Sequence, residues 1–590
     1  MQFIKTIIAV IFGIFIFFGI SVGLLAIFIG TASQSETVQI EENSVFKLSL
    51  NKEIVEIAEE DNPLEDLPIP AEFGGQVSKL SLINIKKAIL KAKEDENIKG
   101  IYLDTDGIAT GFAVMQEIRD ALLDFKKTGK FIYTYASVYG EKEYYLSSVA
   151  DRIFLNPAGA FELNGLNSEI MFFKNALDKI GVKPEVFRVG EYKSAIEPFI
   201  LDKMSDANRL QVTAYLNSIY DTYLQNIGTS RNIDFKELKN ISDQMLIQKP
   251  ADALRFKLVT DTAYYDQVLT EIKKKLEIDE KKKIEFVGMD AVLKSSPDIQ
   301  TEDFSDNKIA VLVAEGEIVD GKGDEDNIGG DKFAAEIRKL RENDKVKAVV
   351  LRINSPGGSA LASEIMWREI MLLKKEKPVI ASMSNVAASG GYYMAMACDT
   401  IVAQPNTITG SIGIFGLLFN TQDLMQNKIG LTFDRVNTGQ FSDLGNPNRN
   451  ISDAERQMIQ NMVNDGYEKF TSKAAQGRKM SLENLKKVAS GRVWTGIQAK
   501  EVGLIDAFGG LDEAIKIAAK SANLGEDFRV KYYPAQKNFM ERLFEKSGSK
   551  VREDALKSEF GEFYPYFKQI QKVSKMKGVQ ARMPYDLLIN

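Results

Sequence analysis

One serine of this chain lies in a setting that suits nucleophilic chemistry. The run SNVAASGGYY at residues 384–393 places Ser389 among small residues, after an expected strand and just before an expected helix. The start of a helix offers free N–H groups and a positive dipole, and both stabilise developing negative charge. A serine at such a place more often only caps the helix. The rest of the chain must decide between these two interpretations.

A glycine-rich turn follows another expected strand. Residues 354–359 read NSPGGS directly after the apolar run AVVLRI at 348–353. Glycines in such a turn let backbone N–H groups point at a ligand, which is the geometry of an oxyanion hole. An ordinary strand-to-helix turn has the same composition, so this motif alone does not establish a site.

The composition excludes most of the common catalytic arrangements. The 590 residues include no histidine, which rules out Ser-His-Asp and Cys-His sites as well as histidine-ligated zinc and haem. The single cysteine, Cys398, rules out an intrachain disulfide framework. A net charge of −7 argues against a dedicated nucleic-acid binder. A hydrolase built on this chain would therefore need a carboxylate, a tyrosine or a lysine as its base.

The chain contains an internal duplication. A dozen identical residues recur in one gapless frame at a spacing of 248, among them the pairs Leu103 and Leu351, Tyr144 and Tyr392, Asp151 and Asp399, and Gly165 and Gly413. Each copy alternates expected strands and helices, which predicts a mostly parallel α/β sheet, and a helix-rich stretch follows each sheet. We expect a first repeat at 45–300, a second at 305–530, and a tail at 531–590 to which the sequence assigns no role.

The two copies differ at the residues that could do chemistry. At the spacing of 248, Ser389 falls on Glu141 and Gly358 on Thr110, so the first copy lacks both the serine and the glycine pair. At a spacing of 249, Lys193 of the first copy falls on Ser442 of the second. Without histidine, a serine and a lysine are the natural nucleophile and base. This complementary loss predicts one composite site, although most lysines are simply solvated.

The N-terminus predicts a membrane anchor. Residues 7–30 are almost wholly apolar, which is enough for a spanning helix of about 20 residues and longer than the apolar core of about 7–15 residues in a cleaved signal. Lys5 precedes this stretch, and Glu36 and Glu41 follow it. The positive-inside rule then leaves the N-terminus in the cytoplasm and the rest of the chain outside. A cleaved signal with a long core is the alternative to an anchor at 1–35.

Four motifs give the chain a specific family resemblance. They are GEYKSAIEPF at 190–199, NSPGGS at 354–359, SNVAASGGYYMA at 384–395 and TGSIGIFG at 409–416. With the anchor and the duplication, they resemble the signal peptide peptidase A (protease IV) family in its long two-repeat bacterial form. The resemblance implies a tandem duplication of a Clp-protease/crotonase-like domain and a Ser/Lys dyad shared between the repeats. Ser389 matches the nucleophile, Lys193 the general base, and Ser411 the serine that hydrogen-bonds the lysine amine.

The resemblance also implies the surroundings of the site. Gly358 matches the oxyanion-hole glycine, and the N–H of Gly390 is expected to be the second donor. The family's long form is a homotetramer at the bacterial inner membrane, with its catalytic part on the periplasmic side, and degrades signal peptides left after secretion. The chain has no Walker-type loop and no EF-hand motif, so we expect no cofactor, no metal and no nucleic-acid partner.

The expected mechanism makes a strong demand on the lysine. Its pKa must fall from about 10.4 to about 7–8 for it to serve as a base at neutral pH. Burial between the repeats without a carboxylate partner could cause that fall. Two alternatives remain at this point, namely a crotonase-type acyl-CoA enzyme with the same fold and a catalytically inactive membrane scaffold.

Overall fold

The computed structural model describes residues 38–58, 79–295, 305–324, 326–534 and 579–583, together with a few isolated positions. The predicted anchor at 1–35 lies outside these ranges, except for isolated residues within it, and so does most of the tail at 531–590. Within the described part of the chain, no helix is long and apolar enough to cross a membrane.

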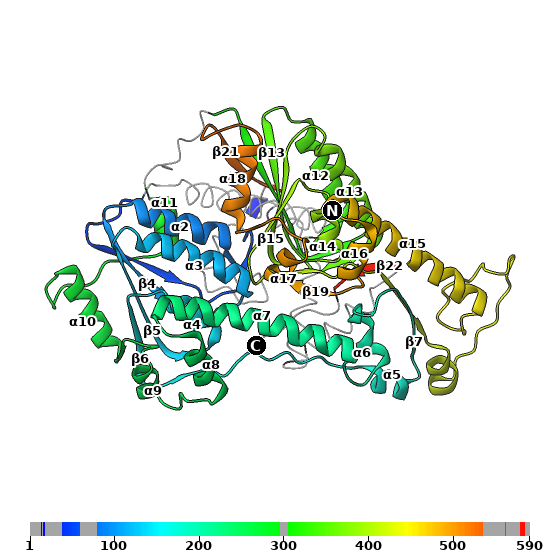
Figure 1. Cartoon of the computed structure of the whole chain (residues 1–590), viewed down its shortest axis with the longest axis horizontal. Coiled ribbons are helices and arrows are strands. Elements are labelled where there is room, and N and C mark those ends of the chain that lie inside the picture. The colour runs from blue at the N-terminus through cyan, green and yellow to red at the C-terminus, as the bar shows by residue number, and fades with distance from the viewer. Residues whose placement is uncertain are drawn as a thin grey trace, which may run out of the picture.

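The first repeat is built on a six-stranded parallel sheet, most of which is drawn in blue to cyan in Figure 1. Buried side chains alternate between its two faces, as a period of two along each strand requires. One face packs against α2, α3 and α4, and the other against α10. The sheet order is β8 (Asp261–Thr262), β6 (Arg152–Phe161), β5 (Phe131–Tyr139), β4 (Ile98–Asp104), β1 (Ser44–Ser49) and β9 (Phe286–Val287), and the helices are α2 (Leu82–Glu94), α3 (Phe112–Lys126), α4 (Glu141–Ser147) and α10 (Tyr265–Leu276).

The second repeat has the same plan. Helices α12, α13 and α14 contribute to the core on one face of its sheet, and α18 to the core on the other. All strand pairs are parallel except that of β17 with β19. The path is β19 (Val493–Thr495), β17 (Ile408–Gly410), β15 (Val379–Ala388), β13 (Val346–Ser355), β10 (Lys308–Glu315) and β21 (Arg529–Tyr533), with β16 (Thr400–Ala403) and β20 (Ala507–Phe508) attached, and the helices are α12 (Gly330–Glu342), α13 (Ala360–Leu373), α14 (Gly390–Ala395) and α18 (Leu511–Ser521).

Equivalent hydrogen bonds confirm the duplication. The hydroxyl of Tyr144 donates to the carbonyl oxygen of Leu258 at 2.7 Å, and that of Tyr392 to the carbonyl oxygen of Leu504 at 2.9 Å. Each tyrosine lies in the short helix after the third core strand, α4 in one repeat and α14 in the other. The predicted α/β class and the repeated plan are therefore both present.

A third sheet joins the two repeats. It contains β12 (Asn327–Gly329), β11 (Glu317–Val319), β14 (Gly357–Ser359), β22 (Val579–Arg582), β18 (Phe415–Asn420) and β7 (Lys183–Arg188) in that order. Strand β7 belongs to the first repeat and pairs antiparallel with β18 of the second. The sequence did not indicate this pairing, because β7 is a short edge strand whose partner lies more than two hundred residues away.

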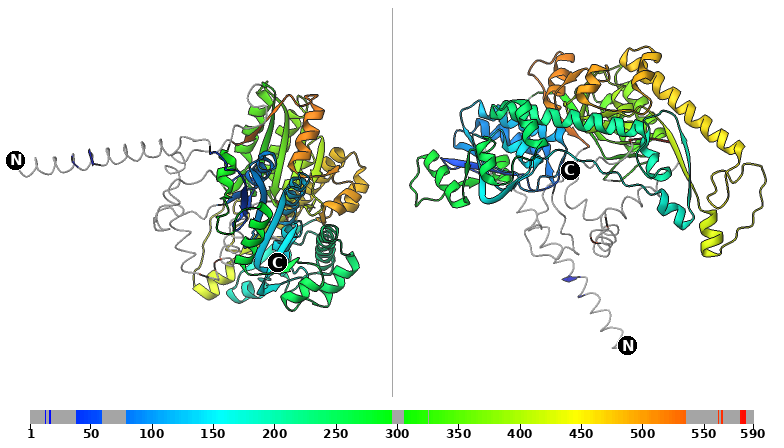
Figure 2. Two further views of the ribbon diagram at one scale, coloured as in Figure 1. Left: turned by 90° about the vertical axis from the view of Figure 1, so that its left-hand side faces the viewer. Right: turned by 60° about the horizontal axis from the view of Figure 1, so that its bottom comes forward.

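A long helix reinforces the junction. Helix α7 (Asp206–Arg231) runs beneath both repeats in Figure 1, and Figure 2 shows the same course from two other sides. Its Ser218 hydroxyl hydrogen-bonds that of Thr495 at 2.7 Å. Its counterpart in the second repeat is α15 (Asp453–Arg478).

The remaining elements are short. They are β2 (Ile54–Val55), β3 (Leu80–Ser81), α5 (Lys174–Ile180), η2 (Ser194–Ile196), α6 (Glu197–Ile200), α8 (Phe235–Asp243), α9 (Pro250–Arg255), α11 (Met289–Lys294), η3 (Leu424–Ile429), α16 (Leu482–Val488) and α17 (Gly496–Glu501).

A buried ion cluster also spans the two repeats. Arg352 on β13 is fully buried, and its guanidinium contacts the carboxylates of Glu56 at 2.8 Å and of Glu117 at 2.6 Å, both from the first repeat. Lys86 on α2 contacts Glu117 as well, at 3.0 Å. Burial alone would raise the pKa of Glu117, but Arg352 and Lys86 together lower it to about 2. The cluster therefore stays charged and holds the repeats in register.

Replacing the arginine tests this role. Arg352→Met should lower the free energy of unfolding by about 3–5 kcal/mol, because it leaves the buried carboxylate of Glu56 without a cation and that of Glu117 with Lys86 alone. Lys487→Met removes an exposed pair with Glu483 and should cost less than about 1 kcal/mol. Urea unfolding of both variants is the measurement, and equal losses would contradict the role given to Arg352.

Candidate active site

The structure brings Lys193 and Ser389 into direct contact. The Nζ atom of Lys193 lies 2.9 Å from the Oγ atom of Ser389, and both residues are completely buried. Lys193 follows β7 of the first repeat, whereas Ser389 immediately precedes α14 of the second. The two residues are 196 positions apart, and the contact depends on the packing of one repeat against the other.

The lysine amine is surrounded by neutral oxygen atoms. Besides Ser389, it contacts the hydroxyl of Ser411 at 3.0 Å and the carbonyl oxygen of Ser411 at 3.1 Å. Burial lowers the pKa of Lys193 well below its usual value, and no opposing effect of a carboxylate accompanies it. The amine is therefore biased towards its neutral form, which has a lone pair able to accept a proton.

Ser389 has an unusual backbone conformation. Its φ of +54° and ψ of −109° fall in a region that residues with a side chain rarely adopt. Its N–H donates to the carbonyl oxygen of Gly410 at 2.8 Å, and its carbonyl oxygen accepts from the N–H of Tyr393 at 2.8 Å. Such conformations cost about 1–3 kcal/mol and are concentrated at functional sites. The strand-to-helix turn thus presents the serine side chain to the lysine.

Backbone contacts on both sides hold the lysine loop. The N–H of Tyr192 donates to the carbonyl oxygen of Ser490 at 3.0 Å. Gln211 on α7 donates to the carbonyl oxygen of Tyr192 at 3.1 Å and accepts from the N–H of Val493 at 3.2 Å. Gly491 lies so close that a Cβ atom there would be 2.6 Å from the backbone nitrogen of Lys193. No sequence motif indicates a role for Gln211 or for Gly491.

Of the two residues predicted for the oxyanion hole, Gly390 begins α14, and Gly358 lies in the turn next to it. A Cβ atom built on Gly357 would be only 2.7 Å from the backbone nitrogen of Gly390. Gly358 approaches β11 closely, since a Cβ atom there would be 2.0 Å from the carbonyl oxygen of Ile318. The turn at 354–359 and the residue after Ser389 therefore adjoin, and only glycine fits at 357 and 358.

The first repeat has neither a serine nor a glycine at the positions that correspond to Ser389 and Gly358. Glu141 begins α4, and its carboxylate accepts from the N–H groups of Asn164 at 3.0 Å and Gly165 at 3.2 Å. Thr110 hydrogen-bonds the carbonyl oxygen of Ile54 at 3.4 Å. The Glu141 carboxylate thus binds backbone N–H groups of its own repeat. The serine–lysine pair in the described part of the chain lies between the two repeats.

The alignment of Lys193 with Ser442 is not matched by local structure. Lys193 follows a strand that belongs to the third sheet, whereas Ser442 lies in an exposed loop and donates to the carbonyl oxygen of Gly439 at 2.9 Å. The residues that precede Ser442 form no strand, because the chain between β18 and α15 extends away from the sheet. The two positions share a place in the sequence frame but not in the fold.

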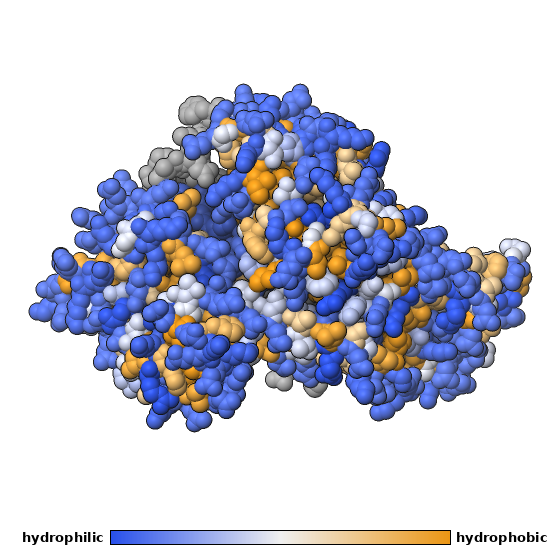
Figure 3. Space-filling model, viewed as in Figure 1, coloured by the Kyte–Doolittle hydropathy of each residue, from blue (hydrophilic) through white to orange (hydrophobic). Residues whose placement is uncertain are grey.

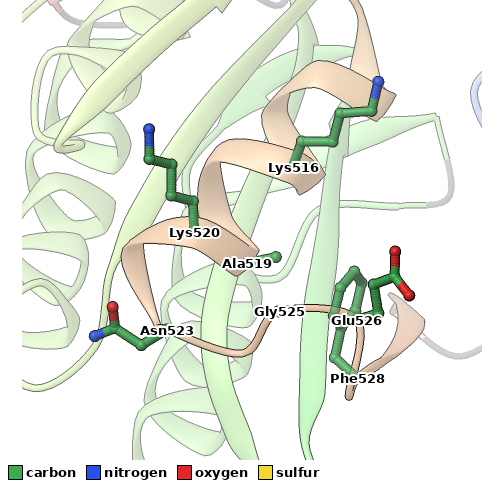
Figure 4. Close-up of a pocket in the computed structure, with 7 residues that line it drawn as sticks. All are labelled: Lys516, Ala519, Lys520, Asn523, Gly525, Glu526 and Phe528. Atoms are coloured by element: carbon green, nitrogen blue, oxygen red, sulfur yellow. The ribbon is translucent and has the colours of Figure 1, made fainter.

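A hollow elsewhere on the surface is formed by other residues. It lies at the end of α18 and the loop that leads to β21, and Figure 4 shows Lys516 and Lys520 projecting from that helix. Phe528 and Glu526 line it from the loop. None of the predicted site residues contributes to this hollow.

Comparison with known proteins identifies the family. The model of peptidase family S49 matches the chain twice, at residues 124–279 and 371–525. The chain belongs to peptidase family S49. Protease 4 of Haemophilus influenzae is 37% identical over 478 residues, which cover 78% of this chain and 76% of that protein. Protease 4 of Salmonella typhi is 36% identical over 495 residues, covering 81% and 78%.

A plant relative extends the comparison. The chloroplastic serine protease SPPA of Arabidopsis thaliana is 38% identical over 457 residues, which cover 76% of this chain and 66% of that protein. The chain is thus a serine peptidase of family S49, and it carries the family's domain twice. Each of the two matched segments lies within one of the structural repeats.

The close approach of Gly491 generates a prediction. Gly491→Ala should lower kcat by about 10²-fold, because the added methyl group displaces the backbone of Lys193 and a small misplacement of a reacting group is costly. Gly430→Ala is the matched control, since Gly430 has nearly the same φ (+83° against +80°) but open space around its Cβ position. The control should retain activity on a chromogenic peptide. Equal activities of the two variants would contradict the positioning role.

Proposed function

We propose that this peptidase hydrolyses peptide bonds with a Ser/Lys dyad in which Ser389 is the nucleophile and Lys193 the general base. The observation that carries the proposal is the 2.9 Å contact between the two side chains, in a buried setting without a carboxylate. A neutral amine at that distance can accept the serine proton directly. The absence of histidine from the chain leaves lysine as the base best placed for this serine.

The reaction proceeds through an acyl-enzyme. Neutral Lys193 takes the proton of Ser389 while the serine oxygen attacks the carbonyl carbon of the substrate. The amides of Gly358 and Gly390 stabilise the oxyanion, where one donor typically contributes about 2.7–4 kcal/mol. Protonated Lys193 then gives its proton to the leaving amine, and water hydrolyses the ester. Ser411 keeps the amine pointed at Ser389 through its hydroxyl and carbonyl oxygens.

Each repeat supplies a different part of this site. Both repeats have a Clp-protease/crotonase-like fold in this proposal, with residues 45–300 supplying the base and 305–530 supplying the nucleophile and the oxyanion hole. The pairing of β7 with β18 supports the division, because it carries Lys193 from one repeat to the serine of the other.

The substrates are signal peptides left after cleavage and other hydrophobic peptides. The apolar stretch at 7–30 supports a membrane anchor at 1–35 that holds the catalytic part on the periplasmic face of a bacterial inner membrane. An enzyme at that surface meets peptides that remain in the bilayer after secretion. The resemblance to signal peptide peptidase A points to the same substrate class.

The active form is a homotetramer in this proposal. The chain between β18 and α15 exposes apolar side chains that a monomer leaves in water, including Ile429, Leu431, Phe433 and Val436, the last of them 97% exposed. Figure 3 shows hydrophobic atoms at the right-hand end of the molecule, where Figure 1 places this segment. Exposed apolar groups of this kind favour contact with another protein surface.

Three substitutions test the dyad. Ser389→Ala and Lys193→Met should each lower kcat for a hydrophobic peptide on the order of 10⁴- to 10⁶-fold, as loss of a nucleophile or base does in other serine peptidases. Ser411→Ala should lower it by about 10²-fold or less, because it only orients the amine. A fluorophosphonate should label Ser389 in the unsubstituted enzyme and, more slowly, in Ser411→Ala, but should not label the other two variants. Near-normal turnover by a folded Lys193→Met enzyme, checked by circular dichroism, would overturn the dyad.

A further inference from the structure

One buried glutamine contacts both repeats beside the active site. Gln211 on α7 is almost completely buried. Its amide nitrogen donates to the carbonyl oxygen of Tyr192 at 3.1 Å, and its amide oxygen accepts from the N–H of Val493 at 3.2 Å. Tyr192 directly precedes Lys193, and Val493 begins β19 of the second repeat. A single side chain therefore links the lysine loop to the other half of the site.

The strand that Gln211 contacts also adjoins the two serines of the site. Val493 on β19 pairs with Gly410 on β17. The carbonyl oxygen of Gly410 accepts from the N–H of Ser389 at 2.8 Å, and Ser411 is the next residue along the chain. The position of β19 is thus tied to that of both serines, and Gln211 holds the lysine loop against this strand.

The amide of Gln211 fits its surroundings in one orientation. The carbonyl group of Tyr192 can only accept a hydrogen bond and the N–H of Val493 can only donate one, so a reversed amide would leave both backbone groups unpaired. The amide nitrogen also donates to the hydroxyl oxygen of Ser194 at 2.9 Å and to the side-chain oxygen of Asn208 at 3.1 Å. A buried polar network with these partners is rigid.

A buried carboxylate stands behind this amide. Glu197 begins α6, shortly after Lys193, and is almost completely buried. Its carboxylate accepts from the side-chain nitrogen of Asn208 at 2.9 Å and from the hydroxyl of Ser205 at 2.6 Å. Hydrogen bonds to a charged acceptor are stronger than those between neutral groups. Asn208 therefore presents its oxygen to Gln211 in a fixed orientation.

Charged groups adjoin the lysine loop without reaching the amine. The carboxylate of Glu197 is held by its own partners, and Glu191 is exposed. The guanidinium of Arg492, from the second repeat, lies 5.1 Å from the ring centre of Tyr192. Among the described residues, none of these charges pairs with Lys193, whose pKa is lowered by burial. The neutral amine therefore depends on how completely the loop stays enclosed.

We propose that Gln211 is the positioning residue of the general base. It holds the backbone at Lys193 at the distance from β19 at which the amine meets Ser389 and stays out of water, while Asn208 and Glu197 fix its orientation. This inference rests on the proposed function. Because Gln211 does not touch the reacting atoms and acts through Lys193, its loss should affect kcat and the pH dependence rather than KM.

The first experiment measures hydrolysis of a hydrophobic peptide by full-length Gln211→Met, a change of similar volume that removes the hydrogen bonds. We expect kcat to fall by about 10²-fold with KM within about 3-fold, because a small displacement of a reacting group is costly. Ser218→Ala is the matched control, since it removes another contact of α7 with the second repeat, the 2.7 Å bond to Thr495. Equal kcat values for the two variants would overturn the proposal.

The second experiment distinguishes positioning of the base from a purely structural role. The rate of Ser389 labelling by a fluorophosphonate is followed against pH. In Gln211→Met the midpoint should move up by at least about one pH unit, because a loosened loop admits water and favours the ammonium form. Ser218→Ala should keep the midpoint of the unsubstituted enzyme. A Gln211→Met enzyme with lower thermal stability but an unchanged midpoint would overturn the claim that Gln211 keeps the amine enclosed.

A further variant tests the residues behind the glutamine. Asn208→Leu should lower kcat by less than Gln211→Met does, because Gln211 keeps its bonds to Tyr192 and Val493 but loses the group that orients it. A kcat equal to that of the unsubstituted enzyme would remove Asn208 and Glu197 from the proposal.

Folding and the proposed dyad are checked separately. If circular dichroism shows that Gln211→Met is unfolded, Gln211→Ala makes the same test, because a water molecule can satisfy both backbone groups there without fixing their separation. If Lys193→Met is inactive and the folded Gln211 variant reacts as the unsubstituted enzyme does, this inference fails and the proposed function stands. If Lys193→Met still turns over normally, both fail.

Discussion

Burial of an amine without a counter-charge is the constraint on which this structure depends. A lysine ammonium ion placed in a dry interior is strongly disfavoured unless a carboxylate accompanies it. Lys193 is completely buried, and the oxygens that it contacts belong to serine residues. The fold resolves this conflict by favouring the neutral amine. The same neutrality is what the proposed general base needs, so in the proposed mechanism the packing at the junction also prepares the site.

A second buried cation shows the opposite solution. Arg352 is as deeply buried as Lys193, but two carboxylates from the first repeat contact it. Burial alone would lower the pKa of Arg352, whereas Glu117 and Glu56 raise it. Arg352 therefore remains charged between the repeats, whereas Lys193 is biased towards its neutral form, as the proposed role of a general base requires. The presence or absence of a carboxylate separates the two roles.

Much of this arrangement could be predicted from the sequence, and the exceptions have physical reasons. The duplication, the α/β class and the proximity of Lys193 and Ser389 follow from repeated residues and from motifs whose types limit the chemistry, whereas the place of Ser411 followed from the family resemblance. The third sheet could not be predicted, because β7, β14 and β22 are strands of a few residues whose partners are distant in sequence. Gln211 was missed for a similar reason, since a buried glutamine on a long helix has no local signature.

The pH dependence of Ser389 labelling by a fluorophosphonate tests the central claim most directly, because it reports the base of the free enzyme without a titrating substrate. Burial lowers the pKa of Lys193, so the reactive neutral amine should already predominate at a pH where an exposed lysine is still protonated. The second-order rate constant should rise in one step with pH and reach a plateau well below about 10.4, the ordinary lysine pKa. A rate constant that still climbs steeply at about pH 10 would show that Lys193 is unperturbed or is not the base.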